Sequence, residues 1–138
     1  MKEELIIEAV VENLEVVNSF IHKFIEQFHC SKRSIMQLDL VVEEIFVNIA
    51  NYAYAPNTGL AKIQLNIKTE PLSISLTFFD NGIPYNPLDK EDPNINLSLE
   101  DRQIGGLGIY LTKNLVDDIS YHYIDGQNVL QFTKSLDQ

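Results

Sequence analysis

Three polar side chains with regular spacing, Glu44, Asn48 and Asn51, have types that can do chemistry. Their spacing of i, i+4 and i+7 places them on one face of a helix. The amide oxygen of Asn48 is a hard ligand of the kind that Mg²⁺ accepts alongside water and substrate phosphates. Glu44, one turn earlier, has a carboxylate that can serve as a general base. The simpler alternative is a narrow strip of polar residues that faces solvent on an otherwise apolar helix.

Asp80 is a second candidate, because it ends a strand-like segment and is followed by the turn Asn81-Gly82-Ile83-Pro84. Its carboxylate can accept a hydrogen bond from the exocyclic amine of a base. Gly82 would let the backbone approach a ligand closely, since it has no side chain. The alternative is turn chemistry alone, because Asp and Asn start turns through bonds to their own backbone.

A glycine-rich segment, Gly105-Gly106-Leu107-Gly108, precedes a helical pattern from Ile109 to about Asp117. Unpaired amides at a helix N-terminus attract anions, so this segment predicts a phosphate site. It is neither the Rossmann fingerprint nor a Walker A motif, because it lacks their context and remaining residues. The long polar stretch before it, residues 86–105, is typical of a functional loop and suggests a lid. The alternative is that the glycines simply end a flexible loop.

Hydrophobic periodicity predicts the elements that must position these residues. A first helix is expected from a cap at Asn13 to Cys30. A second is expected from a capping box of Ser34 with Gln37 to about Tyr54. Strands are predicted at Leu5–Val10, Ala61–Lys68, Ser73–Phe79, Ile119–Ile124 and Val129–Lys134. The resulting order, β-αα-ββ-loop-α-ββ, predicts an α+β two-layer sandwich with a mostly antiparallel sheet and helices on one face.

Composition narrows the function classes. The 138 residues predict one domain, 1–138, and 45% apolar with 22% charged residues argues against disorder. The net charge of −10 excludes a general nucleic-acid or anionic-membrane binder, because phosphate binding needs clustered cations. The single cysteine, Cys30, excludes an internal disulfide and favours the cytoplasm. No targeting or membrane-spanning segment is expected, since glutamates interrupt the apolar N-terminal stretch.

The three polar features also occur in an order that resembles one superfamily. Residues 44–48 resemble the N box of the GHKL ATPases, which include gyrase B, Hsp90, MutL and histidine kinases. Residues 80–82 resemble the G1 box, and residues 106–108 resemble the G2 box. The longer segments VVEEIFVNIANYAY, DNGIPYNP and GGLGIYLTKNLVDDISY are similar to anti-sigma factor serine kinases of the RsbW type. The resemblance spans nearly the whole chain and implies the Bergerat, or GHKL, ATP-binding fold.

The resemblance implies ATP and Mg²⁺ as cofactors and assigns a role to each matching residue. Glu44 would be the base or orienting carboxylate, and Asn48 would hold Mg²⁺. Asp80 would bind the adenine amine, with Gly82 beneath the base. The phosphates would be bound by the lid, residues 86–105, together with Gly106 and Gly108.

In the family this chemistry phosphorylates a serine of an antagonist protein, and the domain also sequesters a sigma factor, usually as a homodimer. Three alternatives stay open: an ATP-dependent binding module with little or no phosphotransfer, the catalytic module of a histidine kinase, and a simple ATP hydrolase. The chain departs from the family pattern at the edges of the expected pocket. Val47 and Tyr52 replace a common threonine and histidine, and Gln127 and Asn128 stand where a threonine often assists the adenine-binding aspartate.

Overall fold

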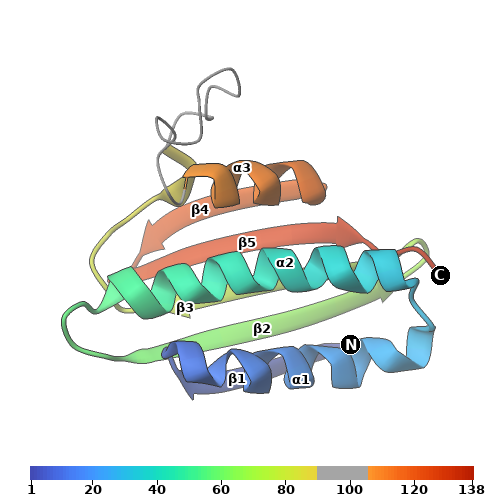
Figure 1. Cartoon of the computed structure of the whole chain (residues 1–138), viewed down its shortest axis with the longest axis horizontal. Helices are drawn as coiled ribbons and strands as arrows, with labels where there is room; N and C mark the ends of the chain where they lie inside the picture. Colours follow the sequence, from blue (N-terminus) through green and yellow to red (C-terminus); the bar gives the residue numbers. More distant parts are fainter. Residues whose placement is uncertain (90–105) are drawn as a thin grey trace.

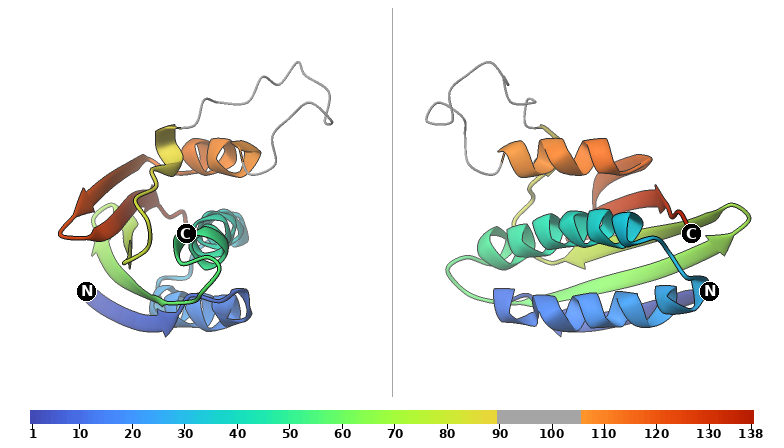
Figure 2. Two further views of the ribbon diagram at one scale, coloured as in Figure 1. Left: turned by 90° about the vertical axis from the view of Figure 1, so that its left-hand side faces the viewer. Right: turned by 45° about the vertical axis from the view of Figure 1, so that its right-hand side comes forward.

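The computed structural model describes residues 1–89 and 106–138 (Figure 1). Helices and strands follow the predicted order: β1 (Lys2–Glu8), α1 (Leu14–Ile25), α2 (Lys32–Asn48), β2 (Leu60–Thr69), β3 (Leu72–Asp80), α3 (Gly106–Leu115), β4 (Asp118–Ile124) and β5 (Gln127–Ser135). The strands form one sheet in the order β1-β2-β3-β5-β4, and each neighbouring pair is antiparallel. The three helices cover one face of this sheet (Figure 2). The predicted α+β two-layer architecture is therefore confirmed.

Alternation along the central strands builds the core. Every second side chain of β2, β3 and β5 is buried against the helices, while the intervening residues face outward. The inward set in β3 contains Ile74, Leu76 and Phe78, as its period-two pattern predicts. The middle helix, α2, supplies the opposing layer with Leu38, Val41, Val42, Ile45 and Phe46. Full burial of each such side chain contributes roughly 1.5–3 kcal/mol.

The start of α2 differs from the prediction. The side chain of Ser31 accepts a 3.1 Å hydrogen bond from the backbone N–H of Ser34, so Ser31 caps a helix that begins at Lys32. The predicted capping box of Ser34 with Gln37 is wrong. Ser34 is buried inside the first turn, and its hydroxyl accepts a 2.9 Å bond from the backbone N–H of Asp137.

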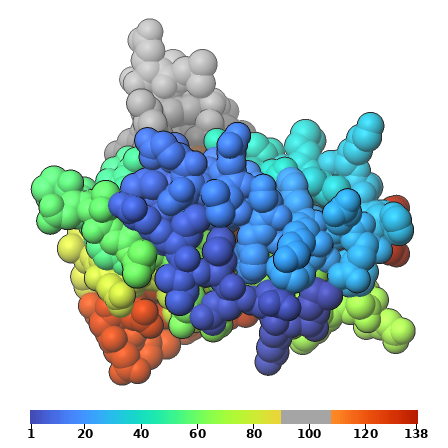
Figure 3. All heavy atoms as spheres, turned by 90° about the horizontal axis from the view of Figure 1, so that it is seen from below, coloured from blue at the N-terminus to red at the C-terminus, as the bar shows by residue number. Residues whose placement is uncertain are grey.

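The first helix, α1, ends earlier than the predicted Cys30, at Ile25. Short 3₁₀ turns flank it at Val11–Asn13 and Glu26–Phe28, and His29 then adopts a left-handed φ of 54°. Asn13 does precede the helix, but its side chain donates to the carbonyl of Glu8 instead of capping. Seen from below Figure 1, the blue segments β1 and α1 supply most of the surface (Figure 3). Among the described residues, no helix is long and apolar enough to cross a membrane.

Candidate functional site

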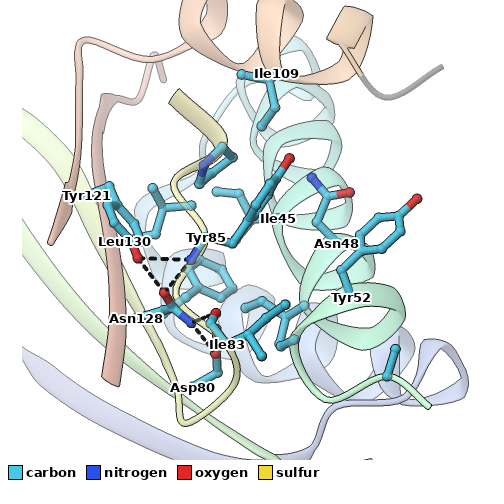
Figure 4. Close-up of a pocket in the computed structure, with 15 residues that line it drawn as sticks. Ile45, Asn48, Tyr52, Asp80, Ile83, Tyr85, Ile109, Tyr121, Asn128 and Leu130 are labelled. Carbon is cyan, nitrogen blue, oxygen red and sulfur yellow. Dashed lines mark hydrogen bonds between the residues drawn. The ribbon is translucent and has the colours of Figure 1, made fainter. Parts of the chain in front are cut away.

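A pocket of about 480 Å³ opens between α2 and the adjacent ends of β3 and β5, next to α3 (Figure 4). Its walls are mostly apolar and include Ile45, Phe78, Ile109 and Leu130. A small polar set projects from different elements around this apolar lining: Asn48, Tyr52, Asp80, Tyr85, Tyr121 and Asn128. A concave apolar cavity with a few convergent polar groups is the usual form of a small-molecule site.

Asp80 reaches the pocket because it ends β3 on the inward-facing register. Its Oδ1 accepts two hydrogen bonds of 2.9 Å, from the backbone N–H of Gly82 and from Nδ2 of Asn128. The side chain is buried, and loss of solvation raises the pKa of Asp80, while the two hydrogen bonds oppose that rise. When ionised, the carboxylate is an acceptor only, so it favours a ligand that brings a hydrogen-bond donor.

Gly82 is essential to the pocket wall for a reason that its sequence context did not reveal. A Cβ atom at this position would lie 2.2 Å from the carbonyl oxygen of Ala53. The next residue, Ile83, donates its backbone N–H to that same oxygen at 3.1 Å and lines the pocket. The close approach that the glycine permits is therefore to the backbone that follows α2. A position of Gly82 beneath a base stays a prediction.

Glu44 and Asn48 lie together, as their spacing predicts. Asn48 lines the pocket and donates Nδ2 to Oε1 of Glu44 at 3.3 Å. Glu44 also lies against α3, because a Cβ atom at Gly108 would come within 2.2 Å of its Cδ. The carboxylate thus sits beside the first turn of α3, the end of a helix that favours negative charge.

Asn51, the third member of the predicted strip, is exposed and does not line the pocket. The α-helical register ends at Asn48 and is followed by one turn of π-helix, Ile49–Ala53. A π turn holds more residues than an α turn, so side chains after it are rotated relative to the α-helical pattern. Tyr52 takes the lining position instead.

The sequence assigned no binding role to Tyr121, and it placed Asn128 only in the region where a threonine often assists the adenine-binding aspartate. Asn128 pairs directly with Asp80 across the β3–β5 ladder, and it is buried. One signal was available: Asn128, Leu130 and Phe132 share the inward side of β5, so a polar residue stands at a core position. Tyr121 shares the same side through its pairing with Leu130.

The phosphate-binding part of the prediction is only partly visible. Gly106 begins α3, and Gly108 faces Glu44, so both lie at the expected helix start. Of the predicted lid, residues 86–89 are described and include the 3₁₀ turn Pro87–Asp89 at the pocket's edge. Residues 90–105, including Gly105, lie outside the described residues. The phosphate contacts of Gly106 and Gly108 therefore stay predictions.

Residues 7–134 match the histidine kinase-like ATPase domain. The chain belongs to this family. It is 34% identical over 103 residues to a serine/threonine-protein kinase BtrW of Bordetella bronchiseptica, which covers 75% of this chain and 72% of the relative. It is 31% identical over 97 residues to a serine-protein kinase RsbW of Bacillus mycoides, covering 67% of this chain but only 59% of that relative.

A solved structure supports the fold independently. A Mycobacterium tuberculosis protein with RsbU and RsbW domains superimposes with a TM-score of 0.64 and 12% sequence identity. The match covers 97% of this chain and 32% of that chain. The GHKL-type fold and the resemblance to RsbW-type kinases are thereby confirmed, whereas the roles of individual residues are not tested by these likenesses.

Proposed function

We propose that this domain binds ATP with Mg²⁺ and transfers the γ-phosphoryl group to a serine of an antagonist protein. One observation carries the proposal: Asp80 and Asn48 line a single pocket, with Glu44 beside the first turn of α3. The names of the relatives, which are serine kinases, support the same activity. Sequestration of a sigma factor and a homodimeric state belong to the same proposal.

The pocket suits an adenine ring. Its apolar lining can pack against both faces of a flat base, while Asp80 accepts a hydrogen bond from the exocyclic amine. A base with a carbonyl in place of the amine would set two acceptors against each other at the carboxylate oxygen that Gly82 and Asn128 do not bond, which is costly. The proposed preference for adenine over guanine follows from this one acceptor.

The residues beside the pocket also fit a magnesium ion. Asn48 directs its amide nitrogen to Glu44, so the same side chain can turn its carbonyl oxygen to a cation. Within residues 1–89 and 106–138, no group of three or more His, Cys, Asp or Glu gathers as a metal site. This fits a cation held by one protein ligand and otherwise by phosphates and water. Bound Mg²⁺ would supply charge neutralisation, which a chain of net charge −10 needs near a polyanion.

Glu44 is proposed to orient the attacking serine hydroxyl and to accept its proton on the carboxylate. Phosphoryl transfer asks mainly for positioning and charge stabilisation, and general-base help contributes typically 10²–10⁴-fold. The bond from Asn48 holds the Glu44 side chain on the α3 side of the pocket. A serine presented at the first turn of α3 would therefore meet this carboxylate.

The test is phosphotransfer from ATP, with Mg²⁺, to a purified candidate antagonist protein. Glu44→Gln is expected to lower the rate by about 10²-fold or more while ATP binding, measured by calorimetry, stays within a few-fold. Glu43→Gln is the matched control, because the neighbouring Glu43 is exposed on a different side of α2. Its rate and its ATP affinity should both match the wild type.

Two results would contradict the proposal. Equal phosphotransfer rates for Glu44→Gln and wild type would show that Glu44 is not the general base. Tight ATP binding with no phosphorylated serine on any tested antagonist would favour the alternative of an ATP-dependent binding module. In that case a sigma factor or antagonist should still bind the chain in an ATP-dependent manner.

A further inference from the structure

Asn128 is the centre of a hydrogen-bond network at the floor of the pocket (Figure 4). Its Nδ2 donates to Oδ1 of Asp80 at 2.9 Å and to the carbonyl of Ile83 at 2.8 Å. Its Oδ1 accepts from the backbone N–H of Tyr85 at 3.1 Å and from the hydroxyl of Tyr121. The network thus joins β3, β4, β5 and the segment that follows β3.

These contacts use the full capacity of the amide. A side-chain amide has two N–H donors and a carbonyl oxygen that accepts two bonds. All four are directed to protein groups, so Asn128 acts on a ligand through its neighbours and not by touching the base. Its orientation is also fixed, because a flipped amide would set its oxygen against the Asp80 carboxylate and its nitrogen against the Tyr85 N–H.

The same contacts determine how Asp80 faces the pocket. Asn128 and the backbone N–H of Gly82 both bond to Oδ1, which holds the carboxylate in one rotamer. Oδ2 is then the oxygen available to a ligand in the pocket. Tyr121 fixes the amide from the far side, and its hydroxyl also accepts a 3.3 Å bond from the Tyr85 N–H.

We propose that Asn128 and Tyr121 are positioning residues for base selection, which hold Asp80 so that one carboxylate oxygen meets the base amine. This inference rests on the proposed binding of ATP. Tyr121 orients the amide of Asn128, and Asn128 in turn holds both Asp80 and the wall segment at Ile83 and Tyr85. Selectivity for an amine at the base edge therefore depends on two side chains that do not bind the base through their own polar groups.

The pH dependence of ATP affinity distinguishes a positioning role of Asn128 from a purely structural one, because only the positioning role changes the pKa of Asp80. Burial raises the pKa of Asp80, and the Asn128 bond lowers it, so loss of that bond raises it further. Among residues 1–89 and 106–138, the ionisable groups that interact with this carboxylate are the tyrosines Tyr54 and Tyr121. Burial raises the pKa values of Tyr54 and Tyr121, so both stay neutral below pH 8. Weakening of ATP affinity toward low pH then reports the protonation of Asp80.

The experiment compares ATP and inosine triphosphate, which has a carbonyl in place of the amine, on the full chain by calorimetry between pH 5 and pH 8. Asn128→Ala is expected to weaken ATP binding by about 10-fold or more, and Tyr121→Phe by a few-fold. In both variants the preference for ATP over inosine triphosphate should shrink, and the acid-side loss of ATP affinity should begin at higher pH. Protonation of the nucleotides themselves does not affect the comparison, because wild type and variants are measured with the same nucleotides at the same pH values.

Matched controls lie on the same two strands. Tyr123→Phe removes an exposed hydroxyl on β4, and Gln131→Ala removes an exposed amide on the outer face of β5. Both should bind as the wild type does. If Asn128→Ala fails to fold, which circular dichroism would reveal, the conservative Tyr121→Phe decides the question.

The outcomes separate the two levels of the argument. Variants that bind weakly but keep the wild-type nucleotide preference and pH profile would overturn the positioning role while leaving ATP binding intact. Unchanged affinity in Tyr121→Phe and Asn128→Ala would overturn it as well. A wild-type chain that binds no adenine nucleotide would overturn both this inference and the proposed function.

Discussion

Gly82→Ala should damage stability and nucleotide binding together, because its new side chain meets backbone. The added Cβ would lie 2.2 Å from the Ala53 carbonyl oxygen and 2.6 Å from its carbon. Neither atom can move without shifting the π turn Ile49–Ala53, which carries Tyr52 and Ala53 into the pocket wall. The substitution must therefore separate the segment after β3 from the end of α2.

The expected cost follows from the contacts. Separation breaks the 3.1 Å bond from Ile83 N–H to Ala53, about 1 kcal/mol. Overpacking adds about 1–3 kcal/mol. The total of about 2–4 kcal/mol lowers the melting temperature by roughly 6–16 °C in a domain of this size. We expect ATP affinity to fall at least about 10-fold, which corresponds to a loss of about 1.4 kcal/mol of binding free energy.

Thermal unfolding by circular dichroism and calorimetry with ATP would measure both effects. Gly126→Ala is the control: Gly126 has nothing within 4 Å of a built Cβ, but its φ is +79°. Backbone strain there costs about 1–2 kcal/mol and should leave ATP affinity unchanged. A Gly82→Ala protein that melts within 2 °C of wild type and binds ATP normally would refute the steric reasoning.

Three further outcomes are expected. In Gly108→Ala the nearest atoms to the new side chain belong to the movable carboxylate end of Glu44, so phosphotransfer should fall while stability stays within about 1 kcal/mol of wild type, aided by the better helix propensity of alanine; normal phosphotransfer would be contrary evidence. Ser31→Ala removes the cap of α2 and should cost about 1 kcal/mol in urea unfolding, whereas the exposed Ser19→Ala should cost nothing measurable. Burial raises the pKa of Asp80, so stability falls as pH rises from about 3.9, the unfolded value, through the folded pKa. Asp80→Asn removes that loss: its stability relative to wild type should increase between pH 4 and pH 7, with ATP affinity reduced, and a pH-independent difference would count against it.

The sequence predicted most of the fold because its patterns are local. Alternation at Ile74, Leu76 and Phe78 and the break at Asn81–Pro84 locate β3 correctly, since both depend on neighbouring residues only. The pairing of Glu44 with Asn48 followed from helical geometry in the same way. Asn51 failed because the helix changes register at Ile49, which no local propensity encodes.

Asn128 was harder to assign for a different reason. Its partnership with Asp80 depends on the register of two strands, and these two residues are 48 positions apart in the sequence. A one-residue slip would turn Asn128 to the opposite face, and the sequence alone does not fix that register. The cap at Ser31 was missed because Ser34 offered an equally plausible signal, and only the contact with Asp137 identifies Ser34 as buried.

The position of β5 between β3 and β4 has a consequence for the order of folding. While a ribosome synthesises the chain, β3 emerges well before the strand that must pair with it. Until β5 has been synthesised, the edge of β3 with which it pairs stays open. Asp80 also lacks its partner Asn128, and the pocket lacks Leu130. Such long-range antiparallel pairing is slow, and an unpaired apolar strand is prone to aggregate. The proposed nucleotide binding would therefore become possible only after β5 has paired with β3, and a nascent chain would gain this ability in one step.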